Sequence, residues 1–123
     1  MITFSLLEKK GNLGNQLFQI ASVIGIAKAN NQPFAFPTWS YAGYFAEQLP
    51  LMPSKHYEHR KEASFSFQPL VLDAGDYDLE GWFQSERYFD IEETRRVFTF
   101  NPLFLNEVRS RFEQALKKKT ILI

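Results

Sequence analysis

Residues 17–29 carry apolar side chains on nearly every face of a helix, so the sequence predicts that this helix is buried. The apolar run 2–7 before it is typical of a buried strand, and a second short strand is predicted at 34–36, closed by Pro37. Strand, glycine-containing turn, helix and strand make a βαβ unit, which predicts a parallel strand pair with a right-handed crossover.

The other predicted elements are short, apart from the last helix. They are a short helix at 41–48, a surface loop at 56–62, a strand at 77–83, a loop at 84–89 and a short helix at 90–97. Asn101 and Pro102 begin a longer helix, because Asn is a good cap and Pro suits the first helical position. Its apolar stripe consists of Leu105, Val108, Phe112 and Leu116.

The length of 123 residues predicts one α/β domain spanning 1–123, with a Rossmann-like parallel sheet flanked by helices. Residues 120–123 are predicted to begin another strand, so the βα alternation is expected to need at least one further unit. Thirteen phenylalanines indicate either an aromatic-rich core or an apolar face that meets a partner.

Composition excludes several classes of function. Fourteen basic and fourteen acidic residues give zero net charge, which argues against a nucleic-acid binder with a broad basic field. The absence of cysteine excludes disulfides, thiol catalysis and Cys-ligated zinc or iron–sulfur sites. No apolar run is long enough to span a bilayer and no signal peptide is apparent, so we expect a cytoplasmic location.

Two histidines and three aspartates lie close together in the sequence without predicting a metal site. His56 and His59 are three residues apart, but no third ligand has suitable spacing, so no metal is expected. The aspartates around Gly75 lack the closing Glu of a calcium loop and favour an ordinary turn before the strand.

The first candidate site is Gly11-x-x-Gly14-Asn15-Gln16, between the first strand and the buried helix. Glycines let a ligand or another backbone approach closely, and a helix N-terminus favours anions such as pyrophosphate. The motif is neither the dinucleotide-binding glycine pattern nor a P-loop. Both a ligand loop and an ordinary turn capped by Asn15 fit these residues.

The second candidate site is the run 82–89, in which aromatic residues flank the polar residues Gln84, Ser85, Glu86 and Arg87. Aromatic faces beside hydrogen-bonding groups suit sugar rings, which have apolar faces and polar edges. A strand end with core aromatics and solvated polar residues fits the same run equally well.

Both runs resemble conserved blocks of the α-1,2-fucosyltransferases of glycosyltransferase family 11. Residues 11–21, GNLGNQLFQIA, are similar to the family's N-terminal G-x-L-G-N-Q-[ML]-F-Q-[YI]-A signature. Residues 81–89, GWFQSERYF, are similar to its G-Y-F-Q-S-E-[KR]-Y-F block, and residues 90–100 resemble the stretch next to that block in the family. The order and separation of the blocks also agree, whereas 38–68 match weakly.

The resemblance implies the N-terminal domain of a GT-B enzyme that transfers fucose from GDP-fucose to the 2-hydroxyl of a galactoside, without a cofactor. By transfer, Gly11, Gly14, Asn15 and Gln16 line the cleft near the fucose and phosphates, and Gln84 and Ser85 contact the acceptor or support that loop. Glu86 is a weak candidate for the base that deprotonates the acceptor hydroxyl, since an ion pair with Arg87 or Arg95 explains it as well.

One family motif is missing. H-x-R-R-x-D, whose arginine binds the GDP phosphates in the family, is absent from the 123 residues, and Arg95-Arg96 lack its flanking His and Asp. We therefore expect little activity from this chain unless a C-terminal domain completes it. The alternative is a carbohydrate-binding or protein-interaction module derived from the fold. A homodimer through the exposed interdomain face and a peripheral membrane contact are further expectations.

Overall fold

The protein is a small mixed α/β domain built on an open parallel sheet. Its structure is a computed structural model that describes residues 1–9, 11–63 and 66–122, without the side chains of 108, 112 and 116–122. The sheet has the strand order β1-β3-β2, and both strand pairs are parallel. The strands are β1 (Ile2–Thr3), β2 (Glu58–Lys61) and β3 (Tyr77–Glu80).

Single bridges extend the parallel array on the other side of β1. Ile2 pairs with Phe34, and Phe36 pairs with Leu51, both in parallel orientation. Backbone bonds from the Ile2 N–H to Pro33 and from the Ala35 N–H to Ile2 hold the first pair. After β1 the chain passes through a helix and pairs with one edge of β1 at Phe34. It later pairs with the other edge of β1 as β3.

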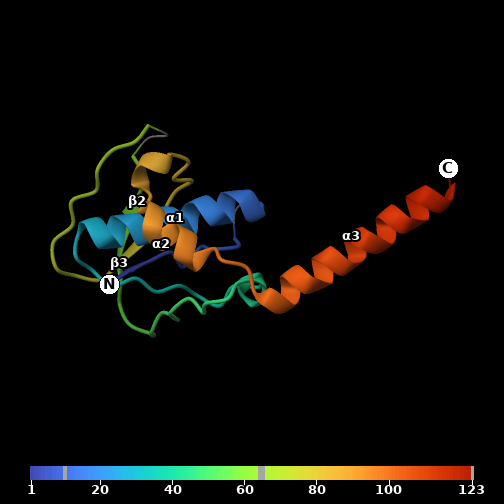
Figure 1. Cartoon of the computed structure of the whole chain (residues 1–123). Helices are drawn as coiled ribbons and strands as arrows, with labels where there is room; N and C mark the ends of the chain where they lie inside the picture. Colours follow the sequence, from blue (N-terminus) through green and yellow to red (C-terminus); the bar gives the residue numbers. More distant parts are fainter. Residues whose placement is uncertain (10, 64–65, 123) are drawn as a thin grey trace.

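Helix α1 (Leu13–Ala29) is the centre of the domain. Its buried residues run without interruption from Gln19 to Ala27, as the all-round apolar pattern predicts. The 3₁₀ turn η2 (Glu86–Tyr88) and helix α2 (Ile91–Val97) pack against it. Figure 1 shows α2 lying across α1. The pKa of Asp90, which caps α2, is lowered by the Glu93 N–H that it accepts and by Lys28 on α1.

Helix α3 (Pro102–Leu122) projects away from the rest of the molecule (Figure 1). It is joined to the domain near its start, where the Phe104 ring lies 4.5 Å from that of Tyr44 in the 3₁₀ turn η1 (Ala42–Tyr44). Leu103 is 78% exposed and Leu105 is 42% exposed. No helix in the described part of the chain has an apolar stretch long enough to cross a membrane.

Most predicted elements are present, with different bounds. The parallel pairing of Ile2 with Phe34 agrees with the βαβ prediction, although 34–36 form bridges and not a full strand. The strand predicted at 2–7 ends at Thr3, because Ser5 turns to Asp78 and bonds it through its N–H and hydroxyl. The strand predicted at 77–83 ends at Glu80, and the helices at 90–97 and from Pro102 are confirmed.

Three predictions are wrong. The loop expected at 56–62 contains β2, whose four side chains are exposed and so give no apolar signal. The helix expected at 41–48 is only the turn η1. Residues 120–122 belong to α3 and not to a strand, while residue 123 lies outside the described part. Of the predicted apolar stripe on α3, the side chains of Val108, Phe112 and Leu116 also lie outside it.

Candidate functional site

The two sequence motifs meet at the carboxyl ends of neighbouring strands. The loop after β1 leads to Gly11, and the turn after β3 consists of Gly81, Trp82 and Phe83. A Cβ atom at Gly11 would lie 2.9 Å from Cζ3 of Trp82, so the indole ring lies directly against this glycine. Gly11 also has φ +84°, a conformation that side chains rarely adopt. The carboxyl ends of parallel strands are the usual place for ligands in open α/β sheets.

A capping box closes the N-terminus of α1. The cap is Asn12, not Asn15 as predicted from the sequence, because the helix begins at Leu13 and not at Leu17. The Asn15 N–H donates to Oδ1 of Asn12, and the Asn12 N–H donates to Oδ1 of Asn15, both at 3.1 Å. Of the first four N–H groups, those of Leu13 and Gly14 therefore remain without a partner among the described residues.

Asn15 is half-buried and uses only one end of its side-chain amide in the capping box. Its Oδ1 atom is used by the cap, while its Nδ2 atom makes no hydrogen bond within the described part of the chain. The amide therefore remains available as a donor beside the free N–H groups of the helix. This arrangement suits an oxygen-rich or anionic ligand.

Gly14 lies in the first turn of α1 and is exposed. A Cβ atom there would meet only Oδ1 of Asn12, at 3.3 Å, and its backbone is helical. The domain therefore has no packing need for glycine at this position, although glycine weakens a helix by about 1 kcal/mol relative to alanine. Close approach of a ligand to the helix backbone would explain a glycine at this position.

Gln16 has a supporting position. It is buried, its Oε1 accepts from the indole N–H of Trp39 at 2.9 Å, and its Nε2 donates to the Gly11 carbonyl at 3.4 Å. Both ends of the side-chain amide are therefore occupied within the protein. This geometry suits a residue that holds the Gly11 loop in place.

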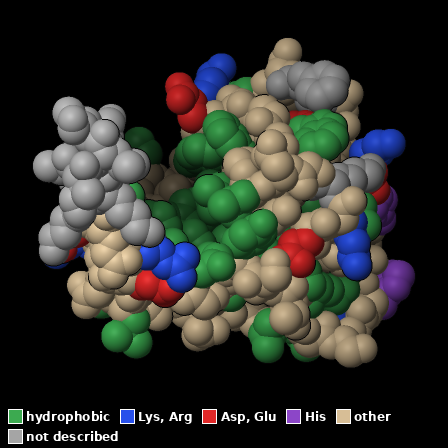
Figure 2. Space-filling view, turned by 90° about the vertical axis from the view of Figure 1, so that its right-hand side faces the viewer, with side chains coloured by type: hydrophobic (Ala, Val, Ile, Leu, Met, Phe, Trp, Pro, Cys, Tyr) green, Lys and Arg blue, Asp and Glu red, His purple; other side chains and the backbone are tan. Residues whose placement is uncertain are grey.

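An aromatic pocket of about 390 Å³ adjoins the start of α1. Its lining comes from the start of α1, from η1 and the residues on either side of it, and from the start of α3 and the segment before it: Leu13, Tyr41, Tyr44, Phe45, Phe100 and Phe104. Tyr44 and Phe100 are each more than 40% exposed. Figure 2 looks onto this end of the molecule and shows a hollow with hydrophobic side chains on its walls. This pocket was not predicted from the sequence.

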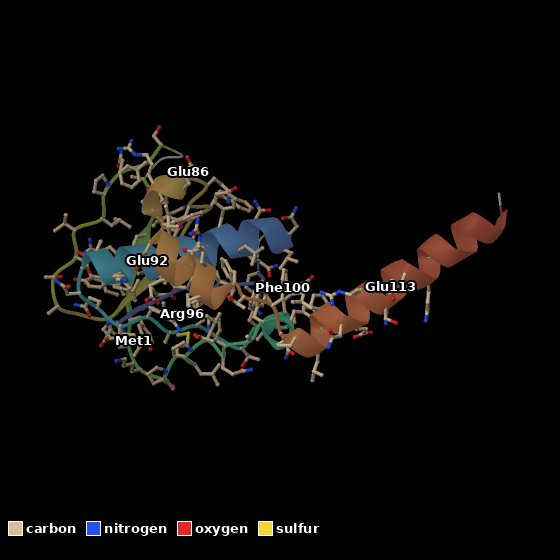
Figure 3. All side chains as sticks on the ribbon, viewed as in Figure 1. Met1, Glu86, Glu92, Arg96, Phe100 and Glu113 are labelled. Atoms are coloured by element: carbon tan, nitrogen blue, oxygen red, sulfur yellow. The ribbon has the colours of Figure 1, made fainter. Side chains whose placement is uncertain are left out.

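The polar residues of the second motif lie further out. Gln84 is exposed and donates to the Trp82 carbonyl, and the Ser85 hydroxyl caps η2 by accepting from the Arg87 N–H. Glu86 is exposed as the first residue of η2, and Figure 3 shows it well away from Phe100, which lines the aromatic pocket. The structure brings Trp82 to the Gly11 loop, and it leaves Glu86 exposed on η2.

One carboxylate near the loop is held by hydrogen bonds. The Ser40 hydroxyl and N–H both donate to Oε1 of Glu8, and these bonds lower the pKa of the Glu8 carboxyl. Glu8 therefore stays ionised and ties the loop after β1 to the segment before η1.

Within the described residues no three His, Cys, Asp or Glu side chains converge, and His59 instead contacts Glu80 at 3.0 Å.

Gly25 is a further residue whose importance was not predicted from the sequence. A Cβ atom there would lie 1.7 Å from the carbonyl oxygen of Tyr88, so only glycine lets η2 pack onto α1. The Ser22 hydroxyl donates to the Phe83 carbonyl at 3.1 Å and the Gln19 amide donates to the Gly81 carbonyl at 3.5 Å. Hydrogen bonds and close packing thus hold much of the second motif against α1. These contacts set the position of the motif relative to Gly11.

Comparisons with family models, with curated proteins and with solved structures found no match to this chain.

Proposed function

We propose that this chain forms the acceptor-side wall of an α-1,2-fucosyltransferase of the GT-B type, which a second domain completes. In this proposal fucose passes from GDP-fucose to the 2-hydroxyl of a galactoside. The observation that carries it is the contact between Gly11 and Trp82, because it joins the two motifs on which the resemblance depends.

The chemistry of the site supports a carbohydrate ligand. The two N–H groups of Leu13 and Gly14 and the Asn15 amide offer hydrogen-bond donors to sugar or phosphate oxygens. The aromatic pocket beside them offers partly exposed rings, such as those of Tyr44 and Phe100, to the apolar face of a pyranose. A pocket of about 390 Å³ is within the usual range for small-molecule sites.

The division of labour between the two domains is inferred from the residues that this chain contains. The chain offers hydrogen-bond donors and aromatic rings, but its 123 residues contain no H-x-R-R-x-D sequence to bind the diphosphate of GDP. We therefore propose that the arginine that stabilises the departing GDP comes from the second domain. The completed enzyme is defined as this chain joined to, or mixed with, a C-terminal fucosyltransferase domain that carries H-x-R-R-x-D.

The variant Asn15→Asp tests the role of the Asn15 amide. The aspartate keeps an oxygen for the Asn12 N–H and places a negative charge at a helix N-terminus, where it is favourable, so the fold should remain intact. It removes the free amide donor and repels phosphate. We expect fucose transfer by the completed enzyme to fall by about 100-fold, the usual effect of losing one such donor.

A matched control is Asp90→Ala, which removes the cap of α2 far from the proposed site. It should lower the free energy of unfolding by about 1 kcal/mol without changing the transfer rate. Turnover of the Asn15→Asp enzyme equal to that of the wild type would show that Asn15 has no part in binding or catalysis.

A further inference from the structure

The turn after β3 has an unfavourable backbone that something must hold. Gly81 has φ +155° and Phe83 has φ +49°, although Phe83 is a bulky residue. A left-handed conformation is unfavourable for such a residue. Phe83 is also 1% exposed, so the turn is fixed against the core and cannot relax towards solvent.

Glu62 holds this turn through its carboxylate. Its Oε1 atom accepts from the N–H groups of Trp82 and Phe83, at 3.1 and 3.2 Å. The Glu62 N–H donates to the Glu80 carbonyl at 2.7 Å, so the β2–β3 pairing continues to the point where the turn begins. Both successive amides of the turn are therefore bound by one oxygen.

Gly81 makes room for this carboxylate. A Cβ atom at Gly81 would lie 2.5 Å from Cβ of Glu62 and 2.9 Å from its Oε1 atom. The other carboxylate oxygen, Oε2, is buried and has no hydrogen-bond partner among the residues that the structure describes. Among the described residues, the two N–H groups of the turn are thus the groups that bind this carboxylate.

We infer that Glu62 is a positioning residue, which holds the turn 81–83 in the conformation that lays the Trp82 ring against Gly11. The carboxylate acts from the β2 side, and Gln19 and Ser22 bind the turn carbonyls from α1. The ring then forms one side of the loop that precedes α1. The consequence for ligand binding rests on the proposed function, whereas the contact itself does not.

NMR spectroscopy of the isolated chain tests the positioning without any ligand. In Glu62→Ala the Trp82 ring should leave Gly11, so the ring-current shift of the Gly11 signals should disappear. In Glu62→Gln the side-chain oxygen can still accept both N–H groups, so the Gly11 shift should remain while the Trp82 and Phe83 amide protons move upfield. Glu58→Ala, an exposed glutamate on β2, is the control and should change neither.

The completed enzyme then tests the consequence. Displacing the loop should lower fucose transfer by about 10- to 100-fold in Glu62→Ala, with most of the activity restored in Glu62→Gln. Gly11 signals that are unchanged in Glu62→Ala would overturn the inference. If that variant does not fold, Trp82 and Phe83 amide protons that do not move in Glu62→Gln would do so, because they would show that the side chain does not bind the turn. The expected shifts in a chain whose completed form transfers no fucose would uphold the positioning role and refute the proposed function.

Discussion

Replacement of Gly25 by alanine should destabilise the domain by about 3 kcal/mol or more, because the new methyl group cannot be accommodated. Its carbon would lie 1.7 Å from the Tyr88 carbonyl oxygen and 2.8 Å from the carbonyl carbon. Relief requires η2 to move off α1, which would also pull on the Ser22 bond to Phe83. In an unhindered helix the same substitution stabilises by about 1 kcal/mol, so even the sign of the effect is informative.

Urea unfolding followed by circular dichroism measures this effect. The matched control is Gly43→Ala, since a Cβ atom at Gly43 meets nothing within 4 Å. The control should leave the free energy of unfolding within about 0.5 kcal/mol of the wild type. A Gly25→Ala protein as stable as the control would mean that η2 does not sit on α1 as described.

Gly14→Ala should change the stability little and lower the activity strongly. The helical backbone accepts alanine, but Oδ1 of Asn12, 3.3 Å from the new carbon, must shift slightly, so the free energy of unfolding should stay within about 1 kcal/mol of the wild type. The methyl group would, however, occupy the space through which a ligand reaches the Leu13 and Gly14 N–H groups. We expect fucose transfer by the completed enzyme to fall by about 10- to 100-fold.

The two readouts of Gly14→Ala must be taken on the same preparation, with Gly43→Ala again as the control. Nearly unchanged stability together with weaker transfer would indicate that the glycine is kept for ligand access. Full transfer by Gly14→Ala would show that no ligand approaches this part of the helix.

Hydrophobic patterning predicted the parts of the fold that are buried. The apolar residues of α1 identified a buried helix, and the alternation in 77–83 located β3. The exposed strand β2 was missed because an edge strand with charged side chains has no apolar face, and only pairing with β3 reveals it. The start of α1 was misplaced because Asn12 and Asn15 are equally good caps in sequence.

The candidate site was predictable only in part. The glycine loop and the run 82–89 were both identified, and parallel strands explain why they meet at one end of the sheet. The aromatic pocket depends on Tyr44 and Phe104, which are far apart in sequence and come together through the unpredicted placement of α3. Glu62 was missed because its role lies in bonds to backbone amides, which leave no pattern in the sequence.

We propose that this chain provides one wall of a fucosyltransferase cleft and that a second domain provides the other. A fucose-transfer assay with GDP-fucose and a galactoside, with and without the C-terminal domain that carries H-x-R-R-x-D, tests it most directly. We predict transfer by the completed enzyme and none by either part alone. Transfer by this chain alone, or no transfer by a correctly folded completed enzyme, would contradict the claim.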